Sequence, residues 1–370
     1  MTKSLKYLSD IMEKITILFA GGGTGGHTIP GICLANELKK IYPQAEIIFF
    51  VPGKPIDKEI LAATPYPYYI NSMTSFSHSL QALCKFPFHC IRSLWQTHRL
   101  FKKHSPNLVI ALGGYASLSA GYYGYWKNIP IFALESNKIA GKTIKALAKI
   151  STKIYTPWQV DGLPDNKIEA IGIPIRTDLP EKQPEDYHNK TNLTILVMGG
   201  SLGSGCINTT ICETLPLLKD LANKLHFIHL CGKNIETVQQ AYNDHQISAT
   251  VLSFYHNMPE LYEKADIVIA RAGGASLAEI KSIGIPSILI PWKNAADEHQ
   301  LHNANEMKNK NAAIVYTEDI FTKENVLHII QEFLNTPSRM YVLSMNAKKI
   351  GQRNAAYDIA QNLASYLSNL

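Results

Sequence analysis

Several features that would define a protein class are absent from this 370-residue sequence. Its six cysteines form no Cys-x-x-Cys pair and show no metal-ligand spacing, so we expect reduced structural thiols and no metal site. The two longest runs without a charged residue, 60–84 and 104–126, are interrupted by prolines, glycines and hydroxyl side chains, which argues against a membrane-spanning helix. Residues 1–13 lack an apolar core long enough for a signal peptide and are expected to form an N-terminal extension.

Acidic residues are also missing from residues 60–134, although the net charge of the whole chain is only +6. Within that stretch, residues 73–103 mix apolar and aromatic side chains with basic ones such as Arg92, Arg99 and Lys102. A surface of this composition is attracted to anionic lipid. No RNA- or DNA-binding module accompanies it, so we expect contact with an anionic membrane surface and no nucleic acid. The alternative is a set of helices whose apolar side belongs to the core.

The order of apolar and polar segments predicts the fold class. Strand-like runs alternate with helical stretches, which indicates parallel sheets covered by helices on both faces. Residues 178–192, with two prolines and many charges, read as a linker. We therefore expect an α/β protein with two doubly wound, Rossmann-like domains that face a cleft, residues 14–177 and 193–346, and a helix over 347–370 that could pack back on the first domain. The predicted strands are 15–20, 46–51, 108–112, 129–134, 193–198, 225–230, 267–270 and 287–290.

Two glycine-rich segments follow predicted strands. The first glycine loop, residues 21–27, reads Gly-Gly-Gly-Thr-Gly-Gly-His between a strand and a helix. The second glycine loop, residues 199–205, lies in the same position in the second domain. Glycine lets the backbone approach a ligand closely, and the following helix offers unpaired amide hydrogens and a positive dipole end. Both loops are therefore expected to meet anions.

The first glycine loop also satisfies a dinucleotide fingerprint, because Gly21, Gly23 and Gly26 have the required spacing. That fingerprint needs an acidic residue at the end of the second strand, where this chain has Phe-Val-Pro-Gly-Lys at 50–54. A dinucleotide enzyme is therefore disfavoured. A Walker A loop is excluded because no Gly-Lys-Ser or Gly-Lys-Thr follows the turn.

Three side chains near such loops carry candidate chemistry. His27, at the mouth of the first glycine loop, suits either a base for a sugar hydroxyl or a donor that positions the ligand. Glu279 follows a third glycine corner, Arg-Ala-Gly-Gly at 271–274, and its carboxylate could accept two hydrogen bonds from a ribose diol or simply face the helix dipole. Gln300 ends a polar stretch over 291–300 that resembles a sugar-binding rim.

Taken together, these motifs resemble the MurG family of GT-B glycosyltransferases over nearly the whole chain from residue 14. Single pieces are weak signals, whereas their joint order and spacing are specific. The matching pieces are GGGTGGH at 21–27 with Pro30-Gly31, Gly113-Gly114-Tyr115, Glu135-Ser136-Asn137 before Ala140-Gly141, Gly172-x-Pro174-x-Arg176-Thr177-Asp178, Gly199-Gly200-Ser201-x-Gly203, the 271–279 segment, and Asp297-x-His299-Gln300.

The resemblance implies an activity. It implies inverting transfer of N-acetylglucosamine from UDP-GlcNAc to the MurNAc 4-hydroxyl of the lipid-linked acceptor lipid I, giving lipid II for peptidoglycan synthesis, without a metal or other cofactor. It further implies a peripheral protein at the cytoplasmic face of the inner membrane, with complexes of cell-wall synthesis as partners.

The resemblance also implies roles for individual residues, with the donor held mainly by the second domain. His27 matches the histidine proposed as base, and Tyr255 lies where the family contacts uracil. Glu279 matches the ribose-binding carboxylate within the segment Gly274, Ala275, Ser276, Leu277, Ala278 and Glu279. The remaining matches are Arg176 and Ser201 toward the donor phosphates, Asn137 and Gln300 around the GlcNAc ring, and Thr24, Gly25 and Gly26 closing over the donor from the first domain.

The chain departs from the family pattern at two positions near these motifs. Leu134 stands where the family usually has His, and Ile173 stands where it usually has Asn. The stretch 117–124 also differs from the usual Gly-Pro-rich form, so details of acceptor binding could differ. A UDP-sugar 2-epimerase, a glycosyltransferase acting on diacylglycerol and a non-catalytic sugar-nucleotide-binding membrane protein remain alternatives.

Overall fold

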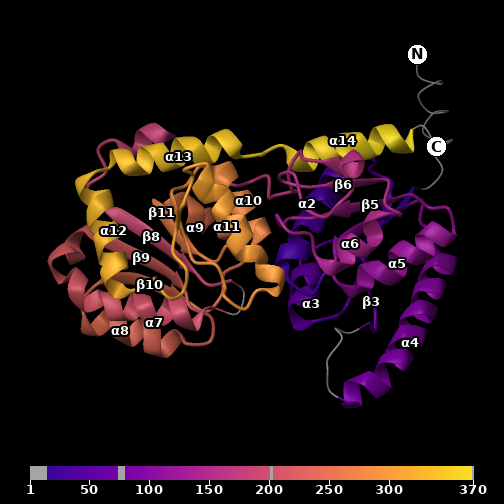
Figure 1. Cartoon of the computed structure of the whole chain (residues 1–370), viewed down its shortest axis with the longest axis horizontal. Coiled ribbons are helices and arrows are strands. Elements are labelled where there is room, and N and C mark those ends of the chain that lie inside the picture. Colours follow the sequence, from indigo (N-terminus) through magenta and orange to yellow (C-terminus); the bar gives the residue numbers. More distant parts are fainter. Residues whose placement is uncertain (1–14, 74–79, 201–202, 369–370) are drawn as a thin grey trace. The chain divides into compact units, whose positions relative to one another are not determined.

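The computed structural model describes residues 15–73, 80–200 and 203–368, without the side chains of residues 80–86. The chain divides into two compact units (Figure 1). Unit 1 contains the chain up to Ser136, residues 140–175 and the chain from Asn354 onward, and unit 2 contains residues 137–139 and 176–353. The main chain thus enters unit 2 after Ile175 and leaves it after Arg353.

The described part of unit 1 contains a sheet of seven parallel strands in the order β3-β2-β1-β4-β5-β6-β7. The central strands β1 and β4 are buried along their whole length, as expected for a parallel sheet covered on both faces. On one face of this sheet, the rings of the paired residues Phe19 and Phe49 stack with centroids 5.0 Å apart. The strands are β1 (Thr16–Gly21), β2 (Glu46–Val51), β3 (Tyr68–Ile70), β4 (Leu108–Gly113), β5 (Ile131–Leu134), β6 (Lys153–Tyr155) and β7 (Ile168–Glu169).

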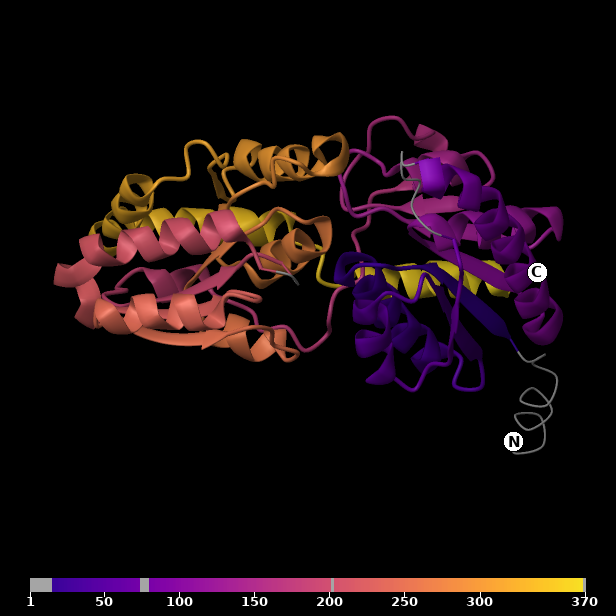
Figure 2. The same ribbon diagram turned by 90° about the horizontal axis from the view of Figure 1, so that it is seen from below.

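Helices lie on both faces of this sheet (Figure 2). The C-terminal helix α14 (Ala355–Leu367) packs beside α2 (Gly25–Ile41), where the Tyr42 hydroxyl donates a hydrogen bond of 3.3 Å to the Ala364 carbonyl. The last segment of the chain is therefore part of unit 1. The other helices are α3 (Pro55–Ala62), α4 (Leu80–His104), α5 (Tyr115–Trp126) and α6 (Lys142–Ala148).

Unit 2 repeats the architecture, with six described parallel strands in the order β10-β9-β8-β11-β12-β13. Its core packs the apolar sides of the helices against β8, β9 and β11, around fully buried side chains such as Phe227 and Phe333. The strands are β8 (Leu193–Met198), β9 (Leu225–Leu230), β10 (Ser248–Leu252), β11 (Ile267–Ala270), β12 (Ser287–Leu289) and β13 (Ile314–Val315). The helices are α7 (Gly205–Thr214), α8 (Ile235–Asp244), α9 (Met258–Lys264), α10 (Gly274–Ile283), α11 (His299–Asn309), α12 (Lys323–Asn335) and α13 (Ser338–Ile350).

The prediction of two doubly wound parallel-sheet domains is confirmed, and each predicted strand is present. The structure differs from the expected segment boundaries in two places. Residues 178–192, expected to be a linker, are part of unit 2. Within them, Pro184–Tyr187 form a 3-10 helix, and Tyr187 is 1% exposed and belongs to the core of this unit. Residues 347–370, expected to be one helix, contain the end of α13 and then α14, separated at residues 351–354, where the chain returns to unit 1.

Candidate functional site

The strand order of each sheet reverses direction once. In unit 1 the reversal lies between β1 and β4, and in unit 2 it lies between β8 and β11. Loops at the carboxyl ends of such strand pairs diverge to opposite faces and leave a crevice in which α/β proteins bind ligands. The glycine loops follow β1 and β8, so both lie at these reversal points.

In unit 1, the first glycine loop leads directly into α2. Gly21, Gly22 and Gly23 all have positive φ, at 134°, 135° and 88°. The Gly22 amide donates to the carbonyl of Gly113 at the end of β4, at 3.3 Å. No acidic residue occurs in the first turn of α2, so its positive end is not offset locally. The loop can therefore meet an anion or an electron-rich group.

A buried carboxylate fixes the shape of this loop. Asp57 of α3 is 0% exposed and accepts hydrogen bonds from the Gly23 amide at 2.7 Å and the Thr28 hydroxyl at 3.0 Å. Its second oxygen accepts from the Lys54 amide at 3.2 Å, as in a capping box. Asp57 was not predicted as part of the site. In the sequence, Lys-Pro-Ile-Asp at 54–57 indicates only the start of a helix with a capping carboxylate.

The ring of His27 is held from one side. Its Nδ1 lies 3.2 Å from the Gly22 carbonyl oxygen and 3.4 Å from the Thr24 hydroxyl. Because a carbonyl oxygen only accepts, Nδ1 carries the proton of the neutral ring and Nε2 carries the lone pair. Nε2 lies above Gly113, where a Cβ atom would approach it to 3.1 Å. His27 is thus oriented to accept a proton at Nε2.

His27 also lines a small pocket in unit 1, which has room for a group about the size of one water molecule or a methyl. Leu134 and Ile173, the two departures from the family pattern, line this same pocket. They are 5% and 1% exposed. The other lining residues are Gly26, Pro30, Leu112 and Ser136. Leu134 and Ile173 therefore give this pocket apolar side chains beside His27, where the family usually has His and Asn.

In unit 2, the second glycine loop leads into α7. Ser204 precedes the helix and its hydroxyl accepts a hydrogen bond from the Ile207 amide at 3.4 Å. Apart from the adjacent residues and the backbone of the same helix, no described atom lies within 4 Å of a Cβ built at Gly205, or at Gly273 before α10. Both helix starts are therefore open to a ligand. Ser201, which was expected to contact the donor phosphates, lies outside the described residues.

The structure brings together Glu279 and Arg176, the expected ribose and phosphate contacts. Glu279 on α10 is 7% exposed and forms an ion pair with Arg176, while its second oxygen accepts from the Tyr262 hydroxyl at 3.3 Å. Burial raises the pKa of Glu279, and Arg176 partly offsets that effect. Burial also raises the pKa of Tyr262 well above its ordinary value, so this hydroxyl stays a hydrogen-bond donor. Tyr262 was not predicted as a partner of Glu279, because no motif in the sequence indicates which tyrosine packs against α10.

The other predicted contacts are distributed over unit 2. The residues Gly274, Ala275, Ser276, Leu277 and Ala278 form the first turns of α10. Tyr255 donates to the Glu260 carboxylate at 2.5 Å, and Gln300 accepts from the Trp292 amide at 3.0 Å. The side-chain Oδ1 of Asn137 accepts a hydrogen bond from the side-chain Nδ2 of Asn303 at 3.0 Å.

Asn303 is a second residue that the sequence did not reveal. It is 0% exposed and donates to the Ala272 carbonyl at 3.1 Å, while its carbonyl oxygen accepts from the Lys138 amide at 2.8 Å. It therefore joins residues 137–139 to the corner before α10. In unit 1, the predicted contacts Thr24, Gly25 and Gly26 directly precede His27: Thr24 is the N-cap of α2, and Gly25 and Gly26 are its first residues.

Comparison with known proteins identifies the family to which the two units belong. Residues 17–156 match the glycosyltransferase family 28 N-terminal domain, and residues 194–363 match the glycosyltransferase family 28 C-terminal domain. The fold is shared with the crystal structure of Acinetobacter baumannii MurG, with a TM-score of 0.75 at 23% identity, covering 95% of this chain and 99% of that one. It is also shared with the UDP-GlcNAc 2-epimerase from Neisseria meningitidis bound to UDP-GlcNAc, with a TM-score of 0.65 at 14% identity, covering 95% and 100%. The chain is therefore a glycosyltransferase of family 28.

A curated relative narrows the class. The chain is 33% identical over 352 residues to the UDP-N-acetylglucosamine–N-acetylmuramyl-(pentapeptide) pyrophosphoryl-undecaprenol N-acetylglucosamine transferase of Myxococcus xanthus, covering 93% of this chain and 91% of the relative. The chain belongs to this family, the MurG N-acetylglucosaminyltransferases.

Proposed function

We propose that this chain transfers N-acetylglucosamine from UDP-GlcNAc to the MurNAc 4-hydroxyl of lipid I, with inversion at the anomeric carbon, and so makes lipid II. Membership of the MurG family supports the reaction class. The single observation that carries the mechanism is His27, whose Nδ1 is held by the Gly22 carbonyl so that Nε2 is free to accept a proton.

The reaction needs one bond to form and one to break. The acceptor oxygen attacks the anomeric carbon of GlcNAc, its proton passes to Nε2 of His27, and the bond to the β-phosphate oxygen breaks with its electron pair leaving on UDP. The resulting imidazolium keeps its Nδ1 hydrogen bond to Gly22. Positive potential for the leaving diphosphate is available from Arg176 and from the open helix starts at Gly205 and Gly273.

Donor binding is assigned to unit 2. Glu279 is a buried carboxylate whose present partners, Arg176 and Tyr262, are both donors. A ribose diol offers the same kind of donor, so it could take the place of one of these partners without leaving the carboxylate unpaired. Tyr255 near uracil, and Gln300 and Asn137 near the sugar ring, complete the proposed contacts.

A transfer assay tests the proposal. UDP-GlcNAc, UDP-GalNAc and UDP-glucose are each incubated with and without a lipid I analogue, and UDP release and lipid product are measured. The proposal requires release that depends on both UDP-GlcNAc and the acceptor. Consumption of UDP-GlcNAc without acceptor, yielding an epimer, would instead identify a 2-epimerase. Binding without turnover would identify a non-catalytic protein, and transfer to diacylglycerol a different lipid glycosyltransferase.

The proposed membrane contact is made by α4 and α5 of unit 1. Along the described part of α4, Ser93, Thr97, Leu100 and Phe101 face the core, whereas large apolar side chains face outward. The apolar residues of this helix are therefore not all core residues. The exposed side chains are Phe88, Ile91, Leu94 and Trp95 on α4, with Tyr122, Tyr125 and Trp126 on α5.

Basic groups surround this apolar patch. The Arg99 guanidinium lies 4.6 Å from the Trp95 ring and the Lys127 ammonium lies 4.3 Å from the Trp126 ring. Among the described helices, none is long and apolar enough to cross a bilayer. The exposed apolar patch and its basic neighbours support peripheral attachment to an anionic surface, which we assign to the cytoplasmic face of the inner membrane.

Vesicle sedimentation tests this attachment. Reversing the charge at Arg92, Arg99 and Lys102 should release the protein from anionic vesicles, and raising the salt concentration should weaken binding of the unmodified protein. Reversal at the exposed Lys219, Lys224 and Lys310 of unit 2 is the matched control and should change little. Binding that is insensitive both to salt and to the first set of changes would remove the membrane assignment.

A further inference from the structure

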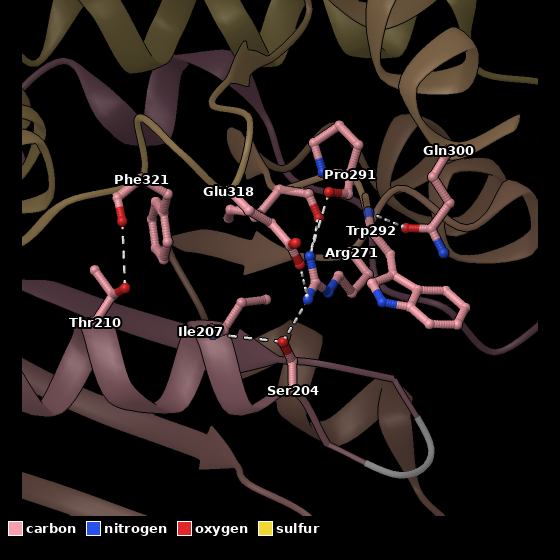
Figure 3. A network of polar contacts seen from close by, with 10 residues as sticks. Ser204, Ile207, Thr210, Arg271, Pro291, Trp292, Gln300, Glu318 and Phe321 are labelled. Carbon is pink, nitrogen blue, oxygen red and sulfur yellow. Dashed lines mark hydrogen bonds and ion pairs between the residues drawn. The ribbon is translucent and has the colours of Figure 1, made fainter. Parts of the chain in front are cut away.

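Arg271 connects the ends of four neighbouring strands in unit 2. It directly follows β11, and its Nη2 donates to the hydroxyl of Ser204, at the end of the loop after β8, at 2.7 Å. Its Nη1 donates to the carbonyls of Ile290 and Pro291 after β12, at 3.1 and 3.3 Å. Its Nη2 also lies 2.5 Å from Glu318, which follows β13. Figure 3 shows the guanidinium at the centre of these contacts.

The charge of Arg271 is already matched by a carboxylate. The side chain of Arg271 is 13% exposed and that of Glu318 is 21% exposed, so the pair is largely shielded from water. A guanidinium has five N–H donors in a fixed plane, and here its terminal nitrogens are directed at protein oxygens on three sides. This geometry fits a structural cross-link better than a group aimed at a ligand.

Each end of the cross-link reaches a segment assigned to the donor. The Ser204 hydroxyl that accepts from Arg271 also accepts from Ile207, so it fixes the start of α7. At the other end, Pro291 precedes Trp292, whose amide donates to Gln300 at 3.0 Å. The same guanidinium therefore supports the helix start assigned to the diphosphate and the rim assigned to the sugar.

We propose that Arg271 is a positioning residue that couples the diphosphate end of the donor site to its sugar rim without touching the donor. The inference rests on the proposed function for the identity of the donor. Glu318 holds the guanidinium in place, so loss of either partner loosens both ends of the site.

Binding measurements with Arg271→Lys and Glu318→Gln separate this role from direct phosphate binding. We expect each variant to lose about tenfold or more in UDP affinity by calorimetry, to discriminate less between UDP-GlcNAc and UDP-glucose, and to bind uridine almost unchanged. If Arg271 were a phosphate ligand, Glu318→Gln would free its charge and UDP affinity would rise. A rise in UDP affinity, or unchanged sugar discrimination, would overturn the proposal.

Hydrogen exchange of the ligand-free protein gives a test that needs no donor. Both variants should exchange faster at the amides of Ile207 and Trp292 together, whereas unchanged exchange at both would overturn the coupling. If the unmodified protein bound no UDP, the proposed function would fail, while the exchange result would still decide the role of Arg271. Arg339→Lys and Glu332→Gln alter another Arg–Glu pair of unit 2, between α13 and α12, and should change neither readout.

Discussion

The two glycine loops occupy equivalent places in the two units, yet their glycines are required for different reasons. In the first glycine loop, a Cβ atom at Gly21 would lie 2.3 Å from the Gly113 carbonyl oxygen, and one at Gly22 would lie 2.9 Å from Asp57. Both residues also have positive φ. The folded backbone of unit 1 itself therefore demands these glycines.

The second glycine loop contains both kinds of glycine. Gly203 has a φ of 76°, and a Cβ there would lie 2.4 Å from the Cys231 carbonyl oxygen. At Gly205, and at Gly273 before α10, no described atom lies within 4 Å of the added Cβ, apart from the adjacent residues and the backbone of the same helix. The protein itself has room for a side chain at these two positions. Because the fold does not require glycine at these two positions, we infer that they face a ligand.

The loops also differ in the chemistry that stands beside them. The first is supported by the buried carboxylate of Asp57 and carries His27, which can accept a proton. The second is supported by the neutral His229–Asn208 pair and is joined to Arg271 through Ser204. This difference supports the proposed division of roles, in which unit 1 transfers the proton and unit 2 binds the diphosphate.

The largest expected effect is on catalysis at the first loop. His27→Ala should lower kcat by about 10² to 10⁴, because the acceptor hydroxyl loses its base. Affinity for UDP and the melting temperature should stay nearly unchanged, since the contacts assigned to the uridine and the diphosphate are in unit 2. The measurements are transfer kinetics with a lipid I analogue, calorimetry and thermal unfolding. The exposed His328→Ala is the control, and near-normal turnover of His27→Ala would reassign the base.

The glycines of the second loop can be separated by substitution. Gly203→Ala should destabilise the protein by about 3 kcal/mol or more, since its Cβ meets a backbone oxygen and its φ is positive. Gly205→Ala should fold normally but bind UDP about tenfold or more weakly, because the methyl occupies space at the start of α7. Thermal unfolding and calorimetry on both variants check this contrast. Normal UDP affinity in Gly205→Ala would mean that the open space does not receive the donor.

The support beneath the second loop predicts a pH dependence of stability. His229 is 0% exposed, with Nε2 donating to Asn208 at 3.1 Å and Nδ1 accepting from Tyr242 at 3.2 Å. Burial lowers its pKa to about 4. The unfolded chain therefore takes up the proton first as pH falls below about 6.5, and the contribution of His229 to stability, complete above that pH, is lost toward pH 4.

We expect His229 alone to reduce the free energy of unfolding by roughly 2 kcal/mol between pH 7 and pH 5. Denaturant unfolding at both values, compared between the unmodified protein and His229→Gln, measures this contribution. The pH slope should flatten in His229→Gln and persist in the exposed His328→Gln. Equal slopes in all three proteins would show that His229 does not carry the effect.

The smallest effect is expected at the support of the first loop. Asp57→Asn keeps the size of the side chain but replaces one acceptor oxygen with an N–H donor, which leaves one of the three donors from Gly23, Thr28 and Lys54 unpaired. The expected loss is about 1 to 2 kcal/mol of stability, with a lowered kcat and unchanged UDP affinity. Thermal unfolding and kinetics measure it. The exposed Asp161→Asn should change neither, and an equal loss of UDP affinity in Asp57→Asn would contradict the separation of roles.

Prediction of the fold succeeded where strands lie inside a sheet. All eight predicted strands are present, whereas β3, β7, β10 and β13 at the edges and β6 beside an edge were not predicted. Those five strands have two to five residues, and most of their residues are not fully buried. A short strand with one face to water lacks the continuous apolar run that marks a central parallel strand.

The amino-acid sequence by itself determined the alternation of strands and helices, the position of both glycine loops and the presence of His27 and Glu279, because each depends on residues close together in the chain. Tertiary structure decided their partners: Asp57 lies 34 residues from Gly23, Arg176 lies 103 residues from Glu279, and Asn303 lies 166 residues from Asn137. A buried polar group must find a hydrogen-bond partner, but local sequence does not say which distant residue supplies it. That choice follows from how the strands are ordered in each sheet.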